Sequence, residues 1–354
     1  MGEVSDENRR IAVVLFNLGG PDSPDAIRPF LFNLFNDPAI IGLPNPARWL
    51  LAQYISRRRE RTARRNYDFI GGKSPLLPNT ITQAKALEAA LGGPDEVRCF
   101  ISMRNWHPFS DETALDIKTF QPDNIVLLPL YPQYAAATTG SSVKDWIRAA
   151  GDVGLDAPTS TICCYPAADG FVSAMANLVV EGWKKAEKAG LPRILYSAHG
   201  LPEREIQRGD PYQWQVEQSA AAIAAAVADR LGGHQEWLIS YQSRVGRLKW
   251  LGPYTDTEIE RAGLEGRPLV VVPLSFVSEH VETLVELDVE YRELAVLHNV
   301  PAYERVRTVG DDAVFIEGLA GMVRRALDGD PLTGCGHGGR ICPGDRPRCP
   351  CTDG

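Results

Sequence analysis

The sequence of 354 residues contains no run of about 18 consecutive apolar residues, and therefore no candidate transmembrane helix. It also lacks the apolar core of a secretory signal, because the N-terminal segment MGEVSDENRR is polar and acidic. A basic excess is missing too: the formal net charge is −8, which argues against nucleic acid as a partner, since phosphate binding needs a basic stripe. These absences predict a globular protein of the cytoplasm.

Buried-type strands alternate with helices along most of the chain. The glycine loop that follows the strand at 11–16 matches neither the Walker pattern nor GxGxxG, which disfavours nucleotide binding. The alternation predicts an α/β fold with two Rossmann-like, doubly wound domains, each with a mainly parallel four-stranded sheet flanked by helices. We expect a first domain at 10–142 plus 302–328, a second domain at 143–301, and a cysteine-rich tail at 329–354.

Two strand ends carry the candidate chemistry. The stretch RILYSAHGLPER leaves His199 at the carboxyl end of a strand, the edge of an open α/β sheet where ligands bind. The stretch at 268–291 is a second apolar strand, which leads into a helix with Glu282, Glu286 and Glu290. Their four-residue spacing stacks like charges along one helix stripe, which is unfavourable unless a cation passes along it. A solvated acidic face and a hydrogen-bonded structural histidine are the alternative interpretations.

The segment 43–66 combines an apolar side with a dense run of arginines. The apolar side is formed by Leu43, Trp49, Leu50, Leu51, Tyr54 and Ile55, and the arginines are Arg57, Arg58, Arg59, Arg61, Arg64 and Arg65. A solvated helix with one ordinary packed face explains this pattern. An interfacial helix that rests on anionic lipid, or a lip over a hydrophobic ligand, explains it as well.

The cysteines are unevenly distributed. Cys99 lies alone, Cys163 and Cys164 are adjacent, and the last twenty residues contain Cys335, Cys342, Cys349 and Cys351. In a cytosolic protein such clustering indicates ligation of a metal or an iron–sulfur cluster rather than disulfide bonds.

Several motifs together resemble those of ferrochelatases. They are NLGGP at 17–21, GGKSP at 71–75, YPQY and TTGSS within 131–142, SAHGLP at 197–202, RGDPY at 208–212, QSRVG and WLGP within 242–253, and FVSEHVETLVELDVEY at 276–291. The resemblance implies a lyase that inserts Fe²⁺ into protoporphyrin IX to form protohaem, the terminal step of haem biosynthesis. A chelatase for coproporphyrin or another tetrapyrrole, and a tetrapyrrole carrier without turnover, are the alternatives.

The resemblance also implies roles for single residues. His199 and Glu282 would face each other across the porphyrin cleft and bind the incoming Fe²⁺, which accepts nitrogen and oxygen ligands. Glu286 would continue an acidic path for iron or protons, and His280 would support Glu282. The macrocycle would be lined or oriented by Leu18, Arg104, Tyr131, Ser141, Trp250 and Phe276, with Arg104 and Ser141 meeting its propionates.

Cluster-bearing ferrochelatases hold a [2Fe-2S] centre with cysteines of the C-terminal tail and one internal cysteine. The implied ligands here are Cys342, Cys349 and Cys351 with either Cys163 or Cys164, which leaves Cys335 spare. A zinc site and free thiols are the alternatives. Some relatives of this kind form homodimers, so a homodimer is open to this chain, as is peripheral contact of 43–66 with the inner face of a membrane.

Overall fold

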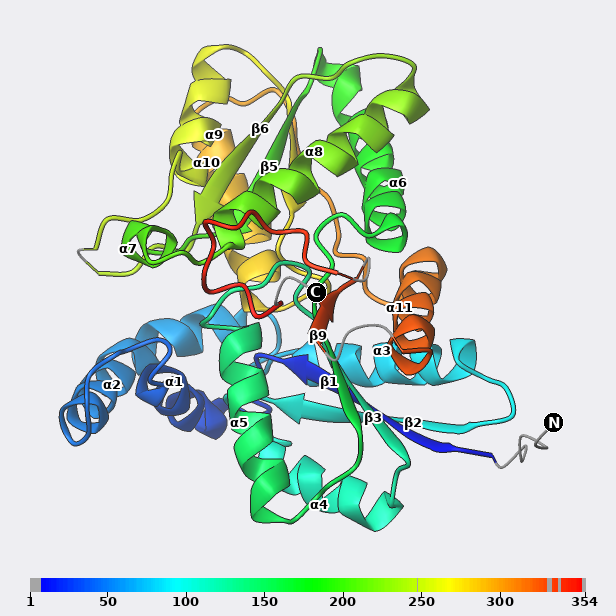
Figure 1. Cartoon of the computed structure of the whole chain (residues 1–354). Helices are drawn as coiled ribbons and strands as arrows, with labels where there is room; N and C mark the ends of the chain where they lie inside the picture. Colours follow the sequence, from blue (N-terminus) through cyan, green and yellow to red (C-terminus); the bar gives the residue numbers. More distant parts are fainter. Residues whose placement is uncertain (1–7, 247, 330–332, 337–338, 352–354) are drawn as a thin grey trace.

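The computed structural model describes residues 8–246, 248–329, 333–336 and 339–351, which form two lobes, each built on a parallel sheet (Figure 1). In this part of the chain the first sheet has the strand order β2-β1-β3-β4-β9, with β1 Arg10–Asn17, β2 Glu96–Met103, β3 Asn124–Pro129, β4 Thr159–Cys164 and β9 Thr333–Cys335. The second has the order β6-β5-β7-β8, with β5 Arg193–His199, β6 Trp237–Gln242, β7 Leu269–Pro273 and β8 Tyr303–Arg305. All paired strands are parallel, so the predicted α/β class is confirmed.

Helices cover both faces of each sheet, which explains why the strands are apolar throughout instead of alternating. On the first sheet, α3 (Leu76–Ala90) and α11 (Ala313–Leu327) lie on one face, and α4 (Ser110–Phe120) and α5 (Thr139–Asp152) on the other. On the second, α6 (Asp169–Ala186) and α8 (Tyr212–Leu231) lie opposite α9 (Thr255–Leu264), the π-helix η3 (Glu282–Glu290) and α10 (Tyr291–Leu297). The hairpin of α1 (Ile27–Asn36) and α2 (Ala47–Asp68) packs beside the first lobe, and the short α7 (Glu203–Gln207) precedes α8.

The two lobes share one hydrophobic core where α6 meets α11. A Cβ atom at Gly170 of α6 would come within 2.7 Å of the Cα of Gly318 in α11, so these helices approach as closely as glycine permits. Because this contact is tight and apolar, it fixes the orientation of the second sheet relative to the first.

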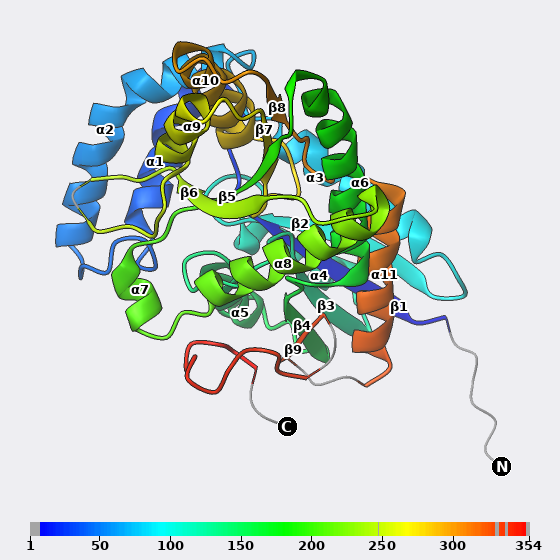
Figure 2. The same cartoon turned by 90° about the horizontal axis from the view of Figure 1, so that it is seen from above.

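Two strands lie in a different sheet from the one expected. β4 falls within the predicted second domain, 143–301, yet it pairs with β3 in the first sheet (Figure 2). β8 was expected to return to the first domain, yet it pairs with β7 in the second sheet. The apolar pattern shows that a segment is a buried strand, but it does not specify which neighbour the strand pairs with. The short β9 of the tail adds a further strand beside β4.

Candidate functional site

The carboxyl ends of β5 and β6 and the first turn of η3 meet around His199, Glu282 and Ser243. Nδ1 of His199 lies 2.9 Å from Oε2 of Glu282, and the hydroxyl of Ser243 donates to the same carboxylate oxygen at 3.4 Å. The side chains of His199 and Glu282 are 37% and 25% exposed, so the pair reaches solvent. The expectation that the two face each other across a cleft is wrong, because no macrocycle fits between atoms 2.9 Å apart. The two side chains instead form one hydrogen-bonded pair.

Ionisation of this pair is set by two opposing effects. Burial disfavours the charged form of Glu282, but the facing His199 outweighs burial and holds the pKa of Glu282 at about 2. Burial also opposes protonation of His199, yet the Glu282 and Glu286 carboxylates raise its pKa above the usual value. The pKa of Glu286 is raised, first by burial and then by the Glu282 charge. Glu282 is therefore the stronger acid, and Glu286 takes up a proton more readily.

The acidic row lies on η3, which is a π-helix over nine residues, whereas most π-helices form a single turn at functional sites. Glu286 accepts the backbone N–H of Ser243 at 2.9 Å and the hydroxyl of Tyr291 at 3.1 Å, and its carboxylate also contacts the Ser243 hydroxyl. Glu282 and Glu286 are half-buried, and Glu290 is exposed. Exposure therefore increases along the helix from Glu282, which contacts His199, to Glu290.

His280 contacts the backbone of Glu282 instead of its carboxylate. The amide N–H of Glu282 donates to Nδ1 of His280 at 3.1 Å, so that nitrogen carries no proton, and burial lowers the pKa of the ring. The ring of Phe276 lies 4.4 Å from His280 and 6.4 Å from His199, centroid to centroid. Trp250 packs over the residue after His199, since a Cβ at Gly200 would come within 3.2 Å of its ring. Phe276 and Trp250 thus form apolar walls beside the pair.

The other predicted macrocycle residues gather at the carboxyl ends of the first sheet. The backbone N–H of Asn105, at the end of β2, donates to the carbonyl of Leu18 at the end of β1 at 3.0 Å. Tyr131 follows β3, and burial raises its pKa. Trp106, two residues after Arg104, and Val281, the residue before Glu282, both pack against the hydrophobic cluster formed by α1 and α2. This cluster therefore connects the residues around Leu18 with the residues around Glu282.

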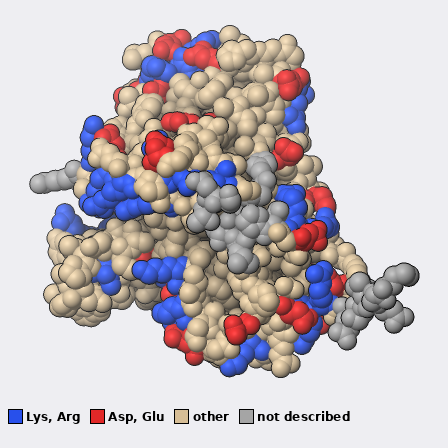
Figure 3. All heavy atoms as spheres, in the orientation of Figure 1, with Lys and Arg blue, Asp and Glu red and all other residues tan. Residues whose placement is uncertain are grey.

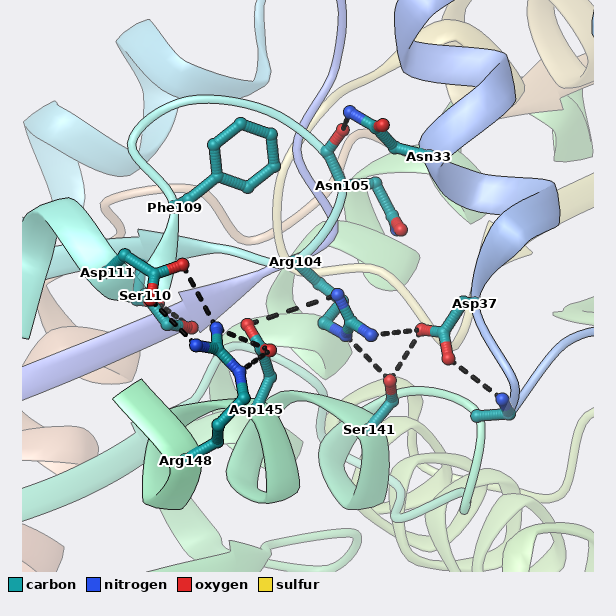
Figure 4. Close-up of polar contacts among 12 residues, drawn as sticks. Asn33, Asp37, Arg104, Asn105, Phe109, Ser110, Asp111, Ser141, Asp145 and Arg148 are labelled. Atoms are coloured by element: carbon teal, nitrogen blue, oxygen red, sulfur yellow. Dashed lines mark hydrogen bonds and ion pairs between the residues drawn. The ribbon is translucent and has the colours of Figure 1, made fainter. Parts of the chain in front are cut away.

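Arg104 is held by a buried carboxylate that the sequence analysis did not single out (Figure 4). Its guanidinium lies 3.0 Å from Asp37 and 4.0 Å from Asp145, and its Nε donates to the hydroxyl of Ser141 at 2.7 Å. The Ser141 hydroxyl in turn donates to Asp37 at 2.5 Å. Arg104 and Ser141 do come together as expected, but the guanidinium is already neutralised. Asp37 lies far from Arg104 in the sequence, and no local pattern connects them.

Six cysteines form one buried group, called here the thiol cluster: Cys163, Cys164, Cys335, Cys342, Cys349 and Cys351. Within it, Sγ of Cys163 lies 3.1 Å from that of Cys351 and 3.9 Å from that of Cys335, and the last two are 3.5 Å apart. Cys164 lies 3.5 Å from Cys335. The cysteine expected to be spare, Cys335, therefore lies among the others.

Known proteins resemble this chain over nearly its whole length. The ferrochelatase family model matches residues 10–327. The ferrochelatase of Phenylobacterium zucineum is 55% identical over 98% of this chain and 99% of its own length, and that of Caulobacter vibrioides strain NA1000 / CB15N is 52% identical over the same shares. The chain belongs to the ferrochelatase family. The predicted enzyme class, a metal chelatase of the lyases, is thereby confirmed.

A solved structure supports the fold alone. The sirohydrochlorin chelatase SirB of Bacillus subtilis subspecies spizizenii, solved in complex with cobalt, superposes with a TM-score of 0.50 at 11% identity. The match covers 90% of this chain and 96% of SirB. The two-lobed parallel architecture of this ferrochelatase family member is thus shared with a second chelatase.

The donor set of the thiol cluster fits a thiolate-bound metal group. All six donors are soft sulfur atoms, and the amide group of Gln215 donates to Sγ of Cys164 at 3.3 Å and of Cys342 at 3.1 Å. Hydrogen bonds from Cys342 and Cys351 lower the pKa of Cys349, which favours its thiolate form. Cys163, Cys335 and Cys351 lie close enough together to share one ion.

The segment predicted to be interfacial contains the helix α2. Trp49, Leu50 and Tyr54 are exposed on it, and the arginines follow along the same helix. Figure 3 shows few charged side chains over α1 and α2 on the face that it presents, whereas Lys and Arg gather near α7 and the tail. None of the helices in the described part of the chain is long and apolar enough to span a bilayer.

Proposed function

We propose that this chain inserts Fe²⁺ into protoporphyrin IX to form protohaem, the terminal step of haem biosynthesis. Membership in the ferrochelatase family supports the reaction. The single observation that supports the assignment of its centre is the 2.9 Å contact between His199 and Glu282.

Metal insertion requires that two pyrrole N–H protons leave the macrocycle. Since Glu282 is ionised, Nδ1 of His199 carries the proton that it donates to the carboxylate, and Nε2 retains a free lone pair. Nε2 takes one pyrrole proton, and the Glu282 charge stabilises the imidazolium that results. Glu286, whose pKa is raised, accepts the next proton and passes it toward Glu290 and solvent. Fe²⁺ arrives before Nε2 is protonated: the lone pair of His199 Nε2 and the Glu282 carboxylate replace water on the ion, and Nε2 takes the pyrrole proton only after the ion has passed to the macrocycle.

Anaerobic incubation of the pure protein with Fe²⁺ and protoporphyrin IX tests the reaction through the absorbance of the metalloporphyrin. We expect turnover, and the absence of any metalloporphyrin would leave only the carrier interpretation. A parallel assay with coproporphyrin tests the second tetrapyrrole substrate. We expect the slower rate there, because Arg104 is paired with Asp37 and offers no free guanidinium to extra carboxylates.

The thiol cluster supports a [2Fe-2S] centre, for which Cys163 or Cys164, Cys342, Cys349 and Cys351 are the proposed ligands. When bound, such a centre supplies redox and structural chemistry, neither of which metal insertion consumes. Iron, acid-labile sulfide and zinc are measured per chain in freshly purified protein, together with visible absorption. The Cys342→Ser variant should lose iron and colour, whereas Cys99→Ser, which lies outside the thiol cluster, should keep both. A wild-type protein without iron would refute the assignment, and zinc in its place would support the alternative.

Peripheral membrane contact from the cytoplasmic side is proposed for α2, because exposed Trp49, Leu50 and Tyr54 lie on the same helix as the arginine run. Co-sedimentation with vesicles that contain anionic lipid should decrease for Leu50→Glu, and equal binding would remove the proposal.

A homodimer is likewise proposed, on the resemblance to cluster-bearing relatives, and light scattering that finds a monomer would reject it.

A further inference from the structure

The first turn of α8 touches the His199 site. The hydroxyl of Tyr212 donates to the backbone carbonyl of His199 at 2.8 Å, and it also lies 2.8 Å from the hydroxyl of Ser275. Ser275 precedes Phe276 in the segment that leads from β7 to η3. Tyr212 therefore ties the end of β5 to the segment that carries the acidic row.

The same turn touches the thiol cluster. Gln215, three residues after Tyr212 and on the same side of the helix, is fully buried. Its amide group donates to the sulfurs of Cys164 and Cys342, and its carbonyl accepts the backbone N–H of Tyr134 at 2.7 Å. One helical turn thus contacts both sites: Tyr212 contacts the His199 site, and Gln215 contacts the thiol cluster.

The tail forms a second connection to the segment between the two sites. The backbone N–H of Arg348 donates to the carbonyl of Gly209 at 3.3 Å, and its guanidinium donates to Glu205 of α7 at 2.8 Å. A Cβ at Gly209 would come within 2.3 Å of Pro347, so the tail lies directly on this loop. Figure 1 shows the tail crossing beside α7 and the start of α8. Arg348 is adjacent to Cys349, so the tail contacts depend on how the thiol cluster holds that cysteine.

We infer that Tyr212 and Gln215 are positioning residues that couple metal loading of the thiol cluster to the placement of His199, an inference that rests on the proposed function. Metal–sulfur bonds to the thiol cluster, which includes Cys342 and Cys164, would fix the two sulfurs that accept hydrogen bonds from Gln215, and so would align its amide group. Tyr212 then holds the His199 carbonyl, which sets where the imidazole lies relative to Glu282. Without metal the sulfurs lose their fixed positions, and the segment from His199 to Tyr212 is released.

Hydrogen exchange of the loaded and chelator-depleted protein, without turnover, tests this coupling. Depletion should speed amide exchange in the segment 199–212 by about tenfold in the wild type, the change expected for the loss of roughly one hydrogen bond. Tyr212→Phe removes one hydroxyl and should keep the wild-type metal content. Its segment should exchange at the faster rate whether metal is bound or not, and its kcat should fall more than its KM changes.

Gln215→Met gives the matched second variant, with Gln213→Met as its control. Gln213 lies in the same turn, and its amide group donates to Glu217 at 3.1 Å on the exposed side of the helix. In Gln215→Met, the amide exchange rate of the segment 199–212 should no longer depend on whether metal is bound. In Gln213→Met it should depend on metal as in the wild type. If Gln215→Met does not fold, Tyr212→Phe carries the test.

Three results would overturn the coupling. Amide exchange in the wild type could be the same with and without metal, the segment 199–212 of Tyr212→Phe could respond to depletion as the wild type does, or the protein could bind no metal. A wild type without turnover that keeps loading-dependent exchange refutes the proposed reaction and leaves the coupling intact. The two failures are therefore distinguishable.

Discussion

Replacement of Glu282 by Gln removes the charge that faces His199 while keeping the shape of the side chain. The pKa of Glu282 lies at about 2 against a usual value of 4.5, a difference that corresponds to about 3 kcal/mol. Solvent screens part of this energy, because the Glu282 and His199 side chains are 25% and 37% exposed. We expect the pair itself to contribute about 1–2 kcal/mol to the free energy of unfolding.

A double-mutant cycle with Glu282→Gln and His199→Gln measures that coupling energy by urea denaturation. Glu282 contributes above its usual pKa of 4.5, and its contribution is lost as the pH falls through about 2. His199 contributes below its usual pKa of 6.5, and its contribution is lost as the pH rises through the raised value. The coupling energy should therefore be largest between about pH 4.5 and 6.5.

The Glu282→Gln variant also tests the catalytic role of Glu282, through its rate of metal insertion. General-base assistance is worth about 10²–10⁴-fold in rate, and Glu282→Gln should lose a factor in this range because the His199 imidazolium is no longer stabilised, while protoporphyrin binding, followed by fluorescence quenching, stays unchanged. The acidic limb of the pH–rate profile should move to lower pH, since the neutral imidazole is the active form and Glu282 no longer favours the imidazolium. Glu293→Gln, an exposed position on α10 outside the acidic row, is the control. A variant with wild-type rate and an unmoved acidic limb would refute the catalytic assignment.

Three further outcomes are expected. Arg305→Met should lower the free energy of unfolding by about 3 kcal/mol in urea, because the buried guanidinium lies 2.6 Å from Glu279 and 2.9 Å from Asp288; an unchanged midpoint contradicts this. Gly200→Ala should lower kcat by up to about 10²-fold, since its Cβ would come within 2.8 Å of a backbone carbonyl beside His199, whereas Gly233→Ala, with open space around it, should not. Cys335→Ser should keep the metal content per chain, because the proposed ligands do not include Cys335, and a loss of metal would add it to the ligand set, since its Sγ lies 3.5 Å from that of Cys351.

The sequence by itself determined the secondary structure, the α/β class and the chemistry that each strand end offers. Apolar strands that stop at glycine and proline predicted where His199 would lie, and four-residue spacing predicted that Glu282, Glu286 and Glu290 would share a helix stripe. These features depend on residues close together along the chain, so periodicity and residue type are sufficient to find them.

Only the tertiary structure decided which of these elements touch. It paired β4 with the first sheet, put the His199 and Glu282 side chains in direct contact, and matched Arg104 with the buried Asp37. It also brought Cys335 into the thiol cluster. Each of these contacts joins residues far apart in sequence, and each depends on which strands pair and which loops meet at one edge of a sheet, for which no local pattern carries a signal.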